Sequence, residues 1–273
     1  MHWPTRLCAP DVAKLAVVSI LSALLCGCLN SSTVILVRQD GSGTVTEKVL
    51  VTMLANGLAG INLQTTNAQP MKAICLNRAL AMGRGVRLDS FKDISENEMT
   101  GYVASYVFDD VSNLIINQQP DLLLLGRLAP QQPARCEPLT FSFARSKPAT
   151  LTINIPKPAA RPKELAPPYA PMKRLSQEEK AVVRKMFDKF RVTIRVQVEG
   201  SIQRTNASGY EPSDKSGLTL LDLNISKLIS NDQQLEKLLA IGRIDNIDDA
   251  RIKLADMSSL QIETVRRVEV EFK

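Results

Sequence analysis

Histidine is nearly absent from this sequence, and its absence excludes several kinds of catalytic site. The only histidine among the 273 residues is His2, in an N-terminal segment that we expect to be removed. Without histidine, the chain cannot form Ser-His-Asp or Cys-His nucleophilic systems or the usual zinc sites. We therefore expect a protein that is not an enzyme and holds no metal or cofactor, although a pair of catalytic carboxylates remains open.

Aromatic residues and blocks of positive charge are also scarce. Phe, Trp and Tyr make up 4% of the chain, which leaves no stacking platform for nucleic-acid bases. Without residues 1–27, the chain keeps 32 basic and 27 acidic residues, spread along the sequence with no polybasic run. This distribution is typical of a solvated surface, and we expect no nucleic-acid partner.

A short apolar run lies near the N-terminus, after two basic residues. Arg6 and Lys14 precede 13 uncharged residues, 15–27. This run is too short to span a bilayer, since a spanning helix needs about 20 apolar residues. Basic residues followed by a short apolar run are typical of a secretory signal peptide, and no basic stop-transfer cluster follows it.

The run ends in Leu-Cys-Gly-Cys, residues 25–28. This tetrapeptide resembles the lipobox of bacterial lipoproteins. The resemblance implies cleavage after Gly27 and a diacylglyceryl group on Cys28, which together with further acylation anchors the chain firmly in a membrane. Leu29 and Asn30 follow without an aspartate, which favours the periplasmic face of the outer membrane over the inner membrane. Cleavage by ordinary signal peptidase and an uncleaved helix remain the alternatives.

Two cysteines would remain besides the acylated Cys28. Cys8 and Cys26 leave with the signal peptide, whereas Cys75 and Cys136 stay in the mature chain. Two thiols in an oxidising compartment can pair, and a disulfide closing about 60 residues stabilises a protein by about 4 kcal/mol. The alternative is two separate buried thiols, because Cys75 lies in an apolar, helix-like segment.

Residues 33–54 predict the first hairpin of the fold. Its turn is Asp40-Gly41-Ser42-Gly43, whose residues tolerate positive φ. These glycines could instead cradle a phosphate, but the lysine and the following helix of a P-loop are missing. One face of the second strand carries Val45, Glu47, Val49, Val51 and Met53.

A buried helix and a second hairpin are expected next. The helix covers 68–82 and ends at Gly83 and Gly85. The hairpin pairs 86–94 with 99–108, and the core-facing side chains of its second strand are Tyr102, Ala104, Tyr106 and Phe108.

Asp109 and Asp110 follow that hairpin. Paired carboxylates at a strand end could bind a cation or act as acid and base. We favour a structural role, in which they cap the short segment 111–115.

The second half of the chain continues with strands and helices. A leucine-rich loop at 117–138 precedes strands at 139–145 and 149–156. Six of the 15 prolines lie in 156–174, which favours a passive, extended spacer. Ser176 and Glu179 form a capping box. The helix that this box opens runs to about residue 190, with a buried stripe of Val183, Met186, Phe187 and Phe190.

Residues 191–200 alternate strictly between apolar and polar side chains, as in a strand with one solvated face. The remaining elements are expected as a strand at 218–225, helical turns at 226–230, 231–241 and 247–257, and a closing strand at 261–273 with Ile262, Val268, Val270 and Phe272 facing inward.

Hairpins with intervening helices predict an α+β fold, with an antiparallel, curved sheet built from hairpins and backed by helices. We divide the chain into a signal peptide, 1–27; a lipidated N-terminus and tether, 28–32; a first α+β part, 33–155; a Pro-rich connector, 156–174; and a second α+β part, 175–273, which completes the same sheet or forms a second small domain.

Four segments carry a wider resemblance: VRQDGSGTVTEKV, GYVASYVFDDVSNL, FRVTIRVQVEGSIQRTNAS and LTLLDLNISKL. In this order, they resemble a group of uncharacterised bacterial lipoproteins with a DGSG hairpin just after the anchor. The resemblance implies a lipoprotein of that design and assigns no catalytic residue. A looser similarity, in topology and hairpin alone, is to mycobacterial LppM-like lipoproteins, whose domain is associated with lipid binding.

Three functions from different classes are open. The first, which we favour, is a membrane-anchored, non-catalytic envelope lipoprotein that binds a partner protein or an envelope component. The second is a lipid- or amphiphile-binding lipoprotein, which predicts an apolar groove larger than about 300 Å³. The third is a carboxylate-dependent hydrolase, which predicts a cleft with buried acids of shifted pKa, such as Asp109 and Asp110.

Overall fold

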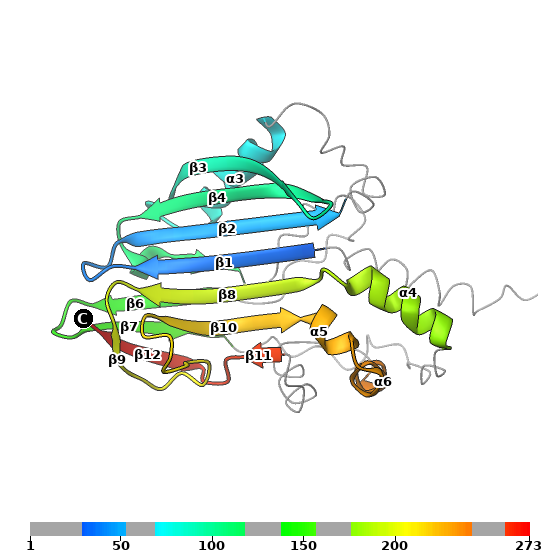
Figure 1. Cartoon of the computed structure of the whole chain (residues 1–273). Coiled ribbons are helices and arrows are strands. Elements are labelled where there is room, and N and C mark those ends of the chain that lie inside the picture. The colour runs from blue at the N-terminus through cyan, green and yellow to red at the C-terminus, as the bar shows by residue number, and fades with distance from the viewer. Residues whose placement is uncertain (1–28, 53–68, 118–137, 157–175, 242–259) are drawn as a thin grey trace, which may run out of the picture.

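Strands dominate the described part of the chain, because apolar and polar residues alternate along most of its segments. The computed structural model describes residues 29–52, 69–117, 138–156, 176–241 and 260–273 (Figure 1). In these ranges, twelve strands form a seven-stranded and a five-stranded sheet. The α+β class and the predominance of antiparallel pairing are confirmed.

The larger sheet has the strand order β11-β10-β8-β1-β2-β4-β3. Neighbouring strands in it are antiparallel, except that β1 and β8 run parallel along their whole shared length. Its strands are β1 (Leu29–Val37), β2 (Gly43–Thr52), β3 (Arg87–Glu96), β4 (Met99–Phe108), β8 (Arg191–Val198), β10 (Gly217–Asn224) and β11 (Leu260–Ile262).

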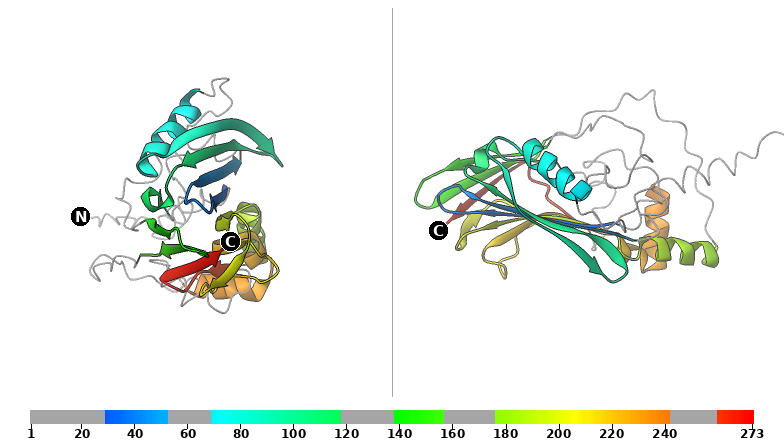
Figure 2. Two further views of the ribbon diagram at one scale, coloured as in Figure 1. Left: turned by 90° about the vertical axis from the view of Figure 1, so that its left-hand side faces the viewer. Right: turned by 90° about the horizontal axis from the view of Figure 1, so that it is seen from above.

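The smaller sheet has the order β5-β6-β7-β12-β9, and all its pairs are antiparallel. Buried side chains from both sheets belong to one hydrophobic core, so the sheets pack against each other (Figure 2). A second sheet therefore covers part of the larger one, where we had expected helices alone. Its strands are β5 (Ile115–Ile116), β6 (Leu139–Ala144), β7 (Ala149–Asn154), β9 (Ile202–Thr205) and β12 (Arg267–Phe272).

The DGSG sequence forms the predicted turn between β1 and β2. The backbone N–H of Ser42 donates to Oδ1 of Asp40 over 2.9 Å, and Gly41 has a φ of +85°. Gly41 also meets the second sheet, because a Cβ there would lie 2.7 Å from Cδ1 of Phe143. Glycine is therefore favoured at position 41 for two reasons: its backbone is in the left-handed region, and a side chain there would collide with Phe143.

Helix α3 (Gln69–Ala81) confirms the predicted helix but is buried on one face only. Cys75 and Ala79 are buried, whereas Leu76 is 50% and Leu80 is 78% exposed. The apolar composition that suggested a wholly buried helix therefore includes leucines that face solvent.

The second hairpin is formed as predicted, with β3 and β4 joined by a turn at Asn97 and Glu98. Tyr102, Ala104 and Tyr106 face the core. The predicted inward face of β2 is confirmed for the described residues Val45, Glu47, Val49 and Val51.

Three helices lie beside the end of the larger sheet at which β1 begins (Figure 1). They are α4 (Gln177–Phe187), α5 (Ile225–Ile229) and α6 (Asp232–Ile241). The capping box of Ser176 and Glu179 is present in full at the start of α4. The expected buried stripe is only half-buried at Val183, Phe187 and Phe190.

The closing strand predicted at 261–273 is wrong as a single element. The chain leaves the larger sheet after β11 and enters the smaller one as β12. Glu263 lies between the two strands, fully buried, and accepts hydrogen bonds from the N–H groups of Gly209 and Val265. A buried carboxylate held in this way turns the chain from one sheet to the other.

The expected tether at 28–32 is also wrong from its second residue onward, because residues 29–32 already belong to β1. Gly27, Cys28, Cys136, most of the leucine-rich loop and most of the connector lie outside the described residues, as do Met53 and the helical turn expected at 247–257. Each sheet contains strands from both sides of the connector.

Candidate functional site

The outer face of the larger sheet presents polar side chains from its central strands. On β1, Asn30 and Ser32 face outward, and Ser32 pairs in register with Thr193 on one side and Lys48 on the other. Two pockets open on this face, and Asn30 lines both of them. They form the principal candidate binding surface in the described part of the chain.

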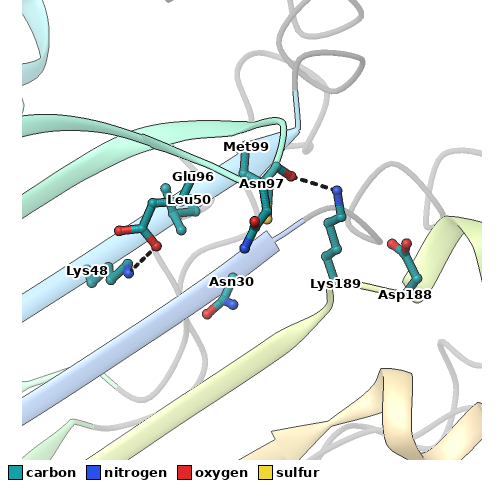
Figure 3. A pocket seen from close by; sticks show the side chains of 8 residues that line it. All are labelled: Asn30, Lys48, Leu50, Glu96, Asn97, Met99, Asp188 and Lys189. Carbon is teal, nitrogen blue, oxygen red and sulfur yellow. Dashed lines mark hydrogen bonds and ion pairs between the residues drawn. The ribbon is translucent and has the colours of Figure 1, made fainter.

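The first of these, which we call the Asn30 pocket, has a volume of about 420 Å³ and lies where the hairpin of β3 and β4 meets the start of β8 (Figure 3). Leu50 and Met99 are each 3% exposed and give it an apolar base. Charged and amide side chains surround that base: Asn30, Lys48, Glu96, Asn97, Asp188 and Lys189.

Ion pairs and hydrogen bonds order the rim of the Asn30 pocket (Figure 3). Nζ of Lys48 lies 2.6 Å from Oε2 of Glu96. Nζ of Lys189, in the segment that leads into β8, donates to the carbonyl oxygen of Asn97 over 2.7 Å and so holds the β3–β4 turn. This contact supports a turn in which Asn97 and Glu98 both have positive φ, a conformation that residues other than glycine adopt at a cost.

The second pocket, the Arg191 groove, has a volume of about 480 Å³ and lies over β1, β8 and β10. Arg191 donates to both carboxylate oxygens of Asp222, over 3.0 and 2.8 Å, and Arg195 pairs with Asp214. The hydrogen bond to Asp222 is the main reason that the pKa of Arg191 is raised. Because these charges are paired within the groove, the surface suits a polar partner that exchanges hydrogen bonds rather than a strongly charged one.

Neither Asp109 nor Asp110 lines any of the three pockets found in the described part of the chain. Arg87 binds Asp109 with both guanidinium NH₂ groups, over 3.0 and 3.2 Å, and this bond lowers the pKa of the carboxyl. Asp110 caps the 3₁₀ helix Val111–Asn113 by accepting from the N–H of Ser112. Both side chains are exposed. This pair therefore lacks the burial that a catalytic carboxylate pair would need, and the structural role is confirmed for Asp110.

Cys75 belongs to a buried polar cluster. The cluster joins α3 to β2 through Arg78, whose guanidinium contacts both carboxylate oxygens of Glu47 at 2.6 Å. Burial raises the pKa values of the Cys75 thiol and of the nearby Tyr106 hydroxyl. Cys75 is a free thiol in the structure, and since Cys136 lies outside the described residues, the disulfide stays a prediction.

The ion pair between Glu47 and Arg78 was missed at the level of sequence. Glu47 was placed correctly on an inward face, and a buried carboxylate requires a partner. Arg78 follows Cys75 by three residues, which puts both on one side of a helix. Those two signals together could have identified the pair.

In the described ranges, no three His, Cys, Asp or Glu side chains gather as a metal site. The same ranges contain no helix with the length and apolarity of a membrane span.

Comparison with known proteins gives little further information. No family model and no curated protein matches the sequence. A solved structure that the chain resembles is the NMR structure of the folded domain of LppM from Mycobacterium tuberculosis, with 9% identity over 90% of each chain and a TM-score of 0.32. A superposition this loose carries no functional argument, so function has to be argued from the residues of this chain.

Proposed function

We propose that this chain is a lipid-anchored protein of the bacterial envelope that binds a partner protein or envelope component through the outer face of its larger sheet. It has no catalytic role. Its first partner is the membrane itself, reached through acyl chains on Cys28 at the periplasmic face of the outer membrane.

One observation carries the proposal. β1 begins at Leu29, directly after the cysteine of the lipobox-like sequence, and it lies inside the larger sheet between β8 and β2. Acyl chains on Cys28 would therefore attach to the end of a central strand with no linker between lipid and fold. The Asn30 pocket, which begins two residues after Cys28, would face solvent close to the headgroups.

The polar surface supports a binding role rather than catalysis. Several of its charges are held in pairs, such as Lys48 with Glu96 and Arg191 with Asp222. Such prearranged side chains lose little conformational entropy when a partner binds. They also orient a partner by complementary hydrogen bonds, which favours specificity.

Metabolic labelling tests the anchor. Cells expressing the full chain are fed labelled palmitate, and we expect the label on the wild-type protein and none on Cys28→Ala. Cys26→Ala is the matched control, because it changes the other cysteine of the lipobox-like sequence and should keep the label. Label that persists on Cys28→Ala would contradict the anchor, and recovery of labelled protein in inner-membrane fractions would contradict the outer-membrane assignment.

An amphiphile-binding lipoprotein is the second candidate, and the base of the Asn30 pocket favours it. Leu50 and Met99 lie beneath polar groups at the anchored end, where an acyl chain and its headgroup would meet such a boundary. Native mass spectrometry of protein purified in mild detergent should then show a retained lipid. A clean apo mass would count against this candidate and leave the first one standing.

A further inference from the structure

A third pocket lies at the other end of the sheets. This terminal pocket has a volume of about 700 Å³ and is built from the β6–β7 turn, the end of β12 and the neighbouring strand β9. Figure 1 shows the C-terminus there, at the opposite end from the start of β1. Gln39, two residues beyond the end of β1, also lines it.

The terminal pocket differs from the other two in charge. Arg145, Lys147 and Lys273 line it, and none of its nine lining side chains is acidic. No ion pair involves these cations in the described structure, whereas the other pockets contain lysines or arginines paired with acids. A hollow with excess positive charge attracts anions.

Hydrogen bonds of Ser146 fix the backbone of the β6–β7 turn. Oγ of Ser146 donates to the carbonyl oxygen of Pro148 over 2.7 Å and lies 3.2 Å from Oγ1 of Thr150. Arg145 and Lys147 flank Ser146, so this bonding fixes the backbone from which both cations extend. Gln203 also lines the pocket, and its Nε2 donates a hydrogen bond to Oγ of Ser201 over 2.9 Å.

Apolar groups complete the terminal pocket. Ala149 and Phe272 are buried in its base, and the ring of Phe272 lies 6.3 Å from that of Phe143. A ligand that fits therefore has an anionic group for the cations and a less polar part for this base.

We propose that the terminal pocket binds a phosphate ester. A guanidinium presents paired N–H groups that match phosphate oxygens, and lysine ammonium groups add point charges beside it. Arg145 is the principal anion ligand, and Lys147 and Lys273 bind the remaining oxygens.

The position of the pocket identifies the source of the ligand, and this step rests on the proposed anchor at Cys28. β1 has nine residues, which at about 3.3 Å each span about 30 Å. With Cys28 at the bilayer, the terminal pocket lies about that far from the headgroups of the anchoring membrane. Its ligand is then a soluble or wall-bound phosphate ester, not a lipid of that membrane.

Isothermal titration of the mature, detergent-purified chain with glycerol phosphate tests the site. We expect saturable binding that weakens with salt and that falls about tenfold or more in Arg145→Gln/Lys147→Gln, because two charge-assisted hydrogen bonds are lost. Lys92→Gln/Lys185→Gln is the matched control, with two exposed cations removed elsewhere and affinity kept. Equal affinity in both double variants, or no saturable binding by the parent chain, would overturn the site.

A second arm separates the two sources of phosphate. The acylated protein is reconstituted in vesicles of phosphatidylcholine, with or without phosphatidylglycerol, and glycerol phosphate binding is measured again. Unchanged affinity supports a ligand from outside the membrane, whereas competition by phosphatidylglycerol overturns that assignment. Failure of the anchor would appear separately, as palmitate label on Cys28→Ala.

Discussion

The ion pair between Glu47 and Arg78 places two charges inside the core, where each alone would be costly. Glu47 is 1% exposed, and both of its carboxylate oxygens contact the guanidinium at 2.6 Å. Such a pair contributes little relative to a well-packed apolar pair, but removal of one partner leaves an uncompensated buried charge. It therefore fixes where α3 sits on the sheet.

We expect Arg78→Met to lower the free energy of unfolding by about 3–5 kcal/mol, because Glu47 would lose its partner. Urea unfolding followed by circular dichroism measures this. Lys72→Met, an exposed position on the same helix, should change stability by less than about 0.5 kcal/mol. Adding Glu47→Leu to Arg78→Met should recover part of the loss. An Arg78→Met chain as stable as the Lys72→Met control would show that the pair does not hold α3.

Gly41 has a positive φ and also lies close to another side chain. Gly85 has a positive φ without such a contact, so a comparison of the two glycines separates the backbone effect from the packing effect. Both Gly41 and Gly85 have φ values above +80°, but only at Gly41 would a Cβ meet another side chain, Phe143, at 2.7 Å. We expect Gly85→Ala to cost about 1 kcal/mol for the backbone alone and Gly41→Ala about 1–3 kcal/mol more. Thermal unfolding compares them. Equal losses would mean that the hairpin turn does not pack on the second sheet.

Local residue patterns explain which of these features were predictable. The DGSG turn was found because the conformational needs of a hairpin turn are local, and the inward position of Glu47 followed from strand alternation. The contact between Gly41 and Phe143 joins residues 102 positions apart, and nothing in the local pattern encodes it. The partner of Glu47 lies 31 positions away, so finding it requires two separate patterns, the inward face of the strand and the inward side of the helix, to be combined.

Helix α4 shows how a surface element depends on charges from elsewhere in the chain. Nζ of Lys180 lies 2.6 Å from Oε1 of Glu236, and Arg184 binds Asp232 and the carbonyl oxygen of Ile229. These contacts tie α4 to α5 and α6. The hydrogen bond from Arg184 is the main reason that the pKa of Asp232 lies below its usual value.

The lowered pKa of Asp232 predicts that acid loosens α4. The folded state favours the ionised carboxylate, so its stabilising effect is complete above the unfolded pKa of about 3.9 and is lost as the pH falls through the lower folded value. Hydrogen exchange in α4, corrected for intrinsic rates, should accelerate below about pH 4 relative to the central strands. Asp232→Asn should remove this pH dependence. Acid acceleration that survives in Asp232→Asn would assign it to other groups.

The first residue of α4 could be predicted from the sequence, but the contacts that attach the helix to α5 and α6 could not. The capping box lies within four residues and was read correctly from Ser176 and Glu179. The stripe expected to be buried is half-buried, and the buried member of the first turns is Lys180, whose partners come from α6. In the same way, the break at Glu263 depends on Gly209, far away in sequence, so alternation alone read β11 and β12 as one strand.

At the scale of the whole molecule, the chain crosses between layers in a way that couples its two halves. β1, from before the connector, pairs with β8, from after it, and β7 pairs with β12. The sequence predicted most of these strands individually. It left open whether the second part completes the same sheet, because the choice of partner strand is set by long-range packing rather than by the strand's own residues.

This pairing predicts that the two halves do not separate when the connector is cut. A specific protease site is inserted between residues 156 and 174, the purified chain is cleaved, and the fragments are analysed by size exclusion. We expect one peak with the elution volume of the uncut parent in native buffer, and two fragments only in denaturant, because separation would expose the hydrophobic core that both halves share. Unfolding of the uncut chain should follow a single transition. Fragments that elute apart in native buffer, each folded, would show two independent domains and would contradict the pairing of β1 with β8.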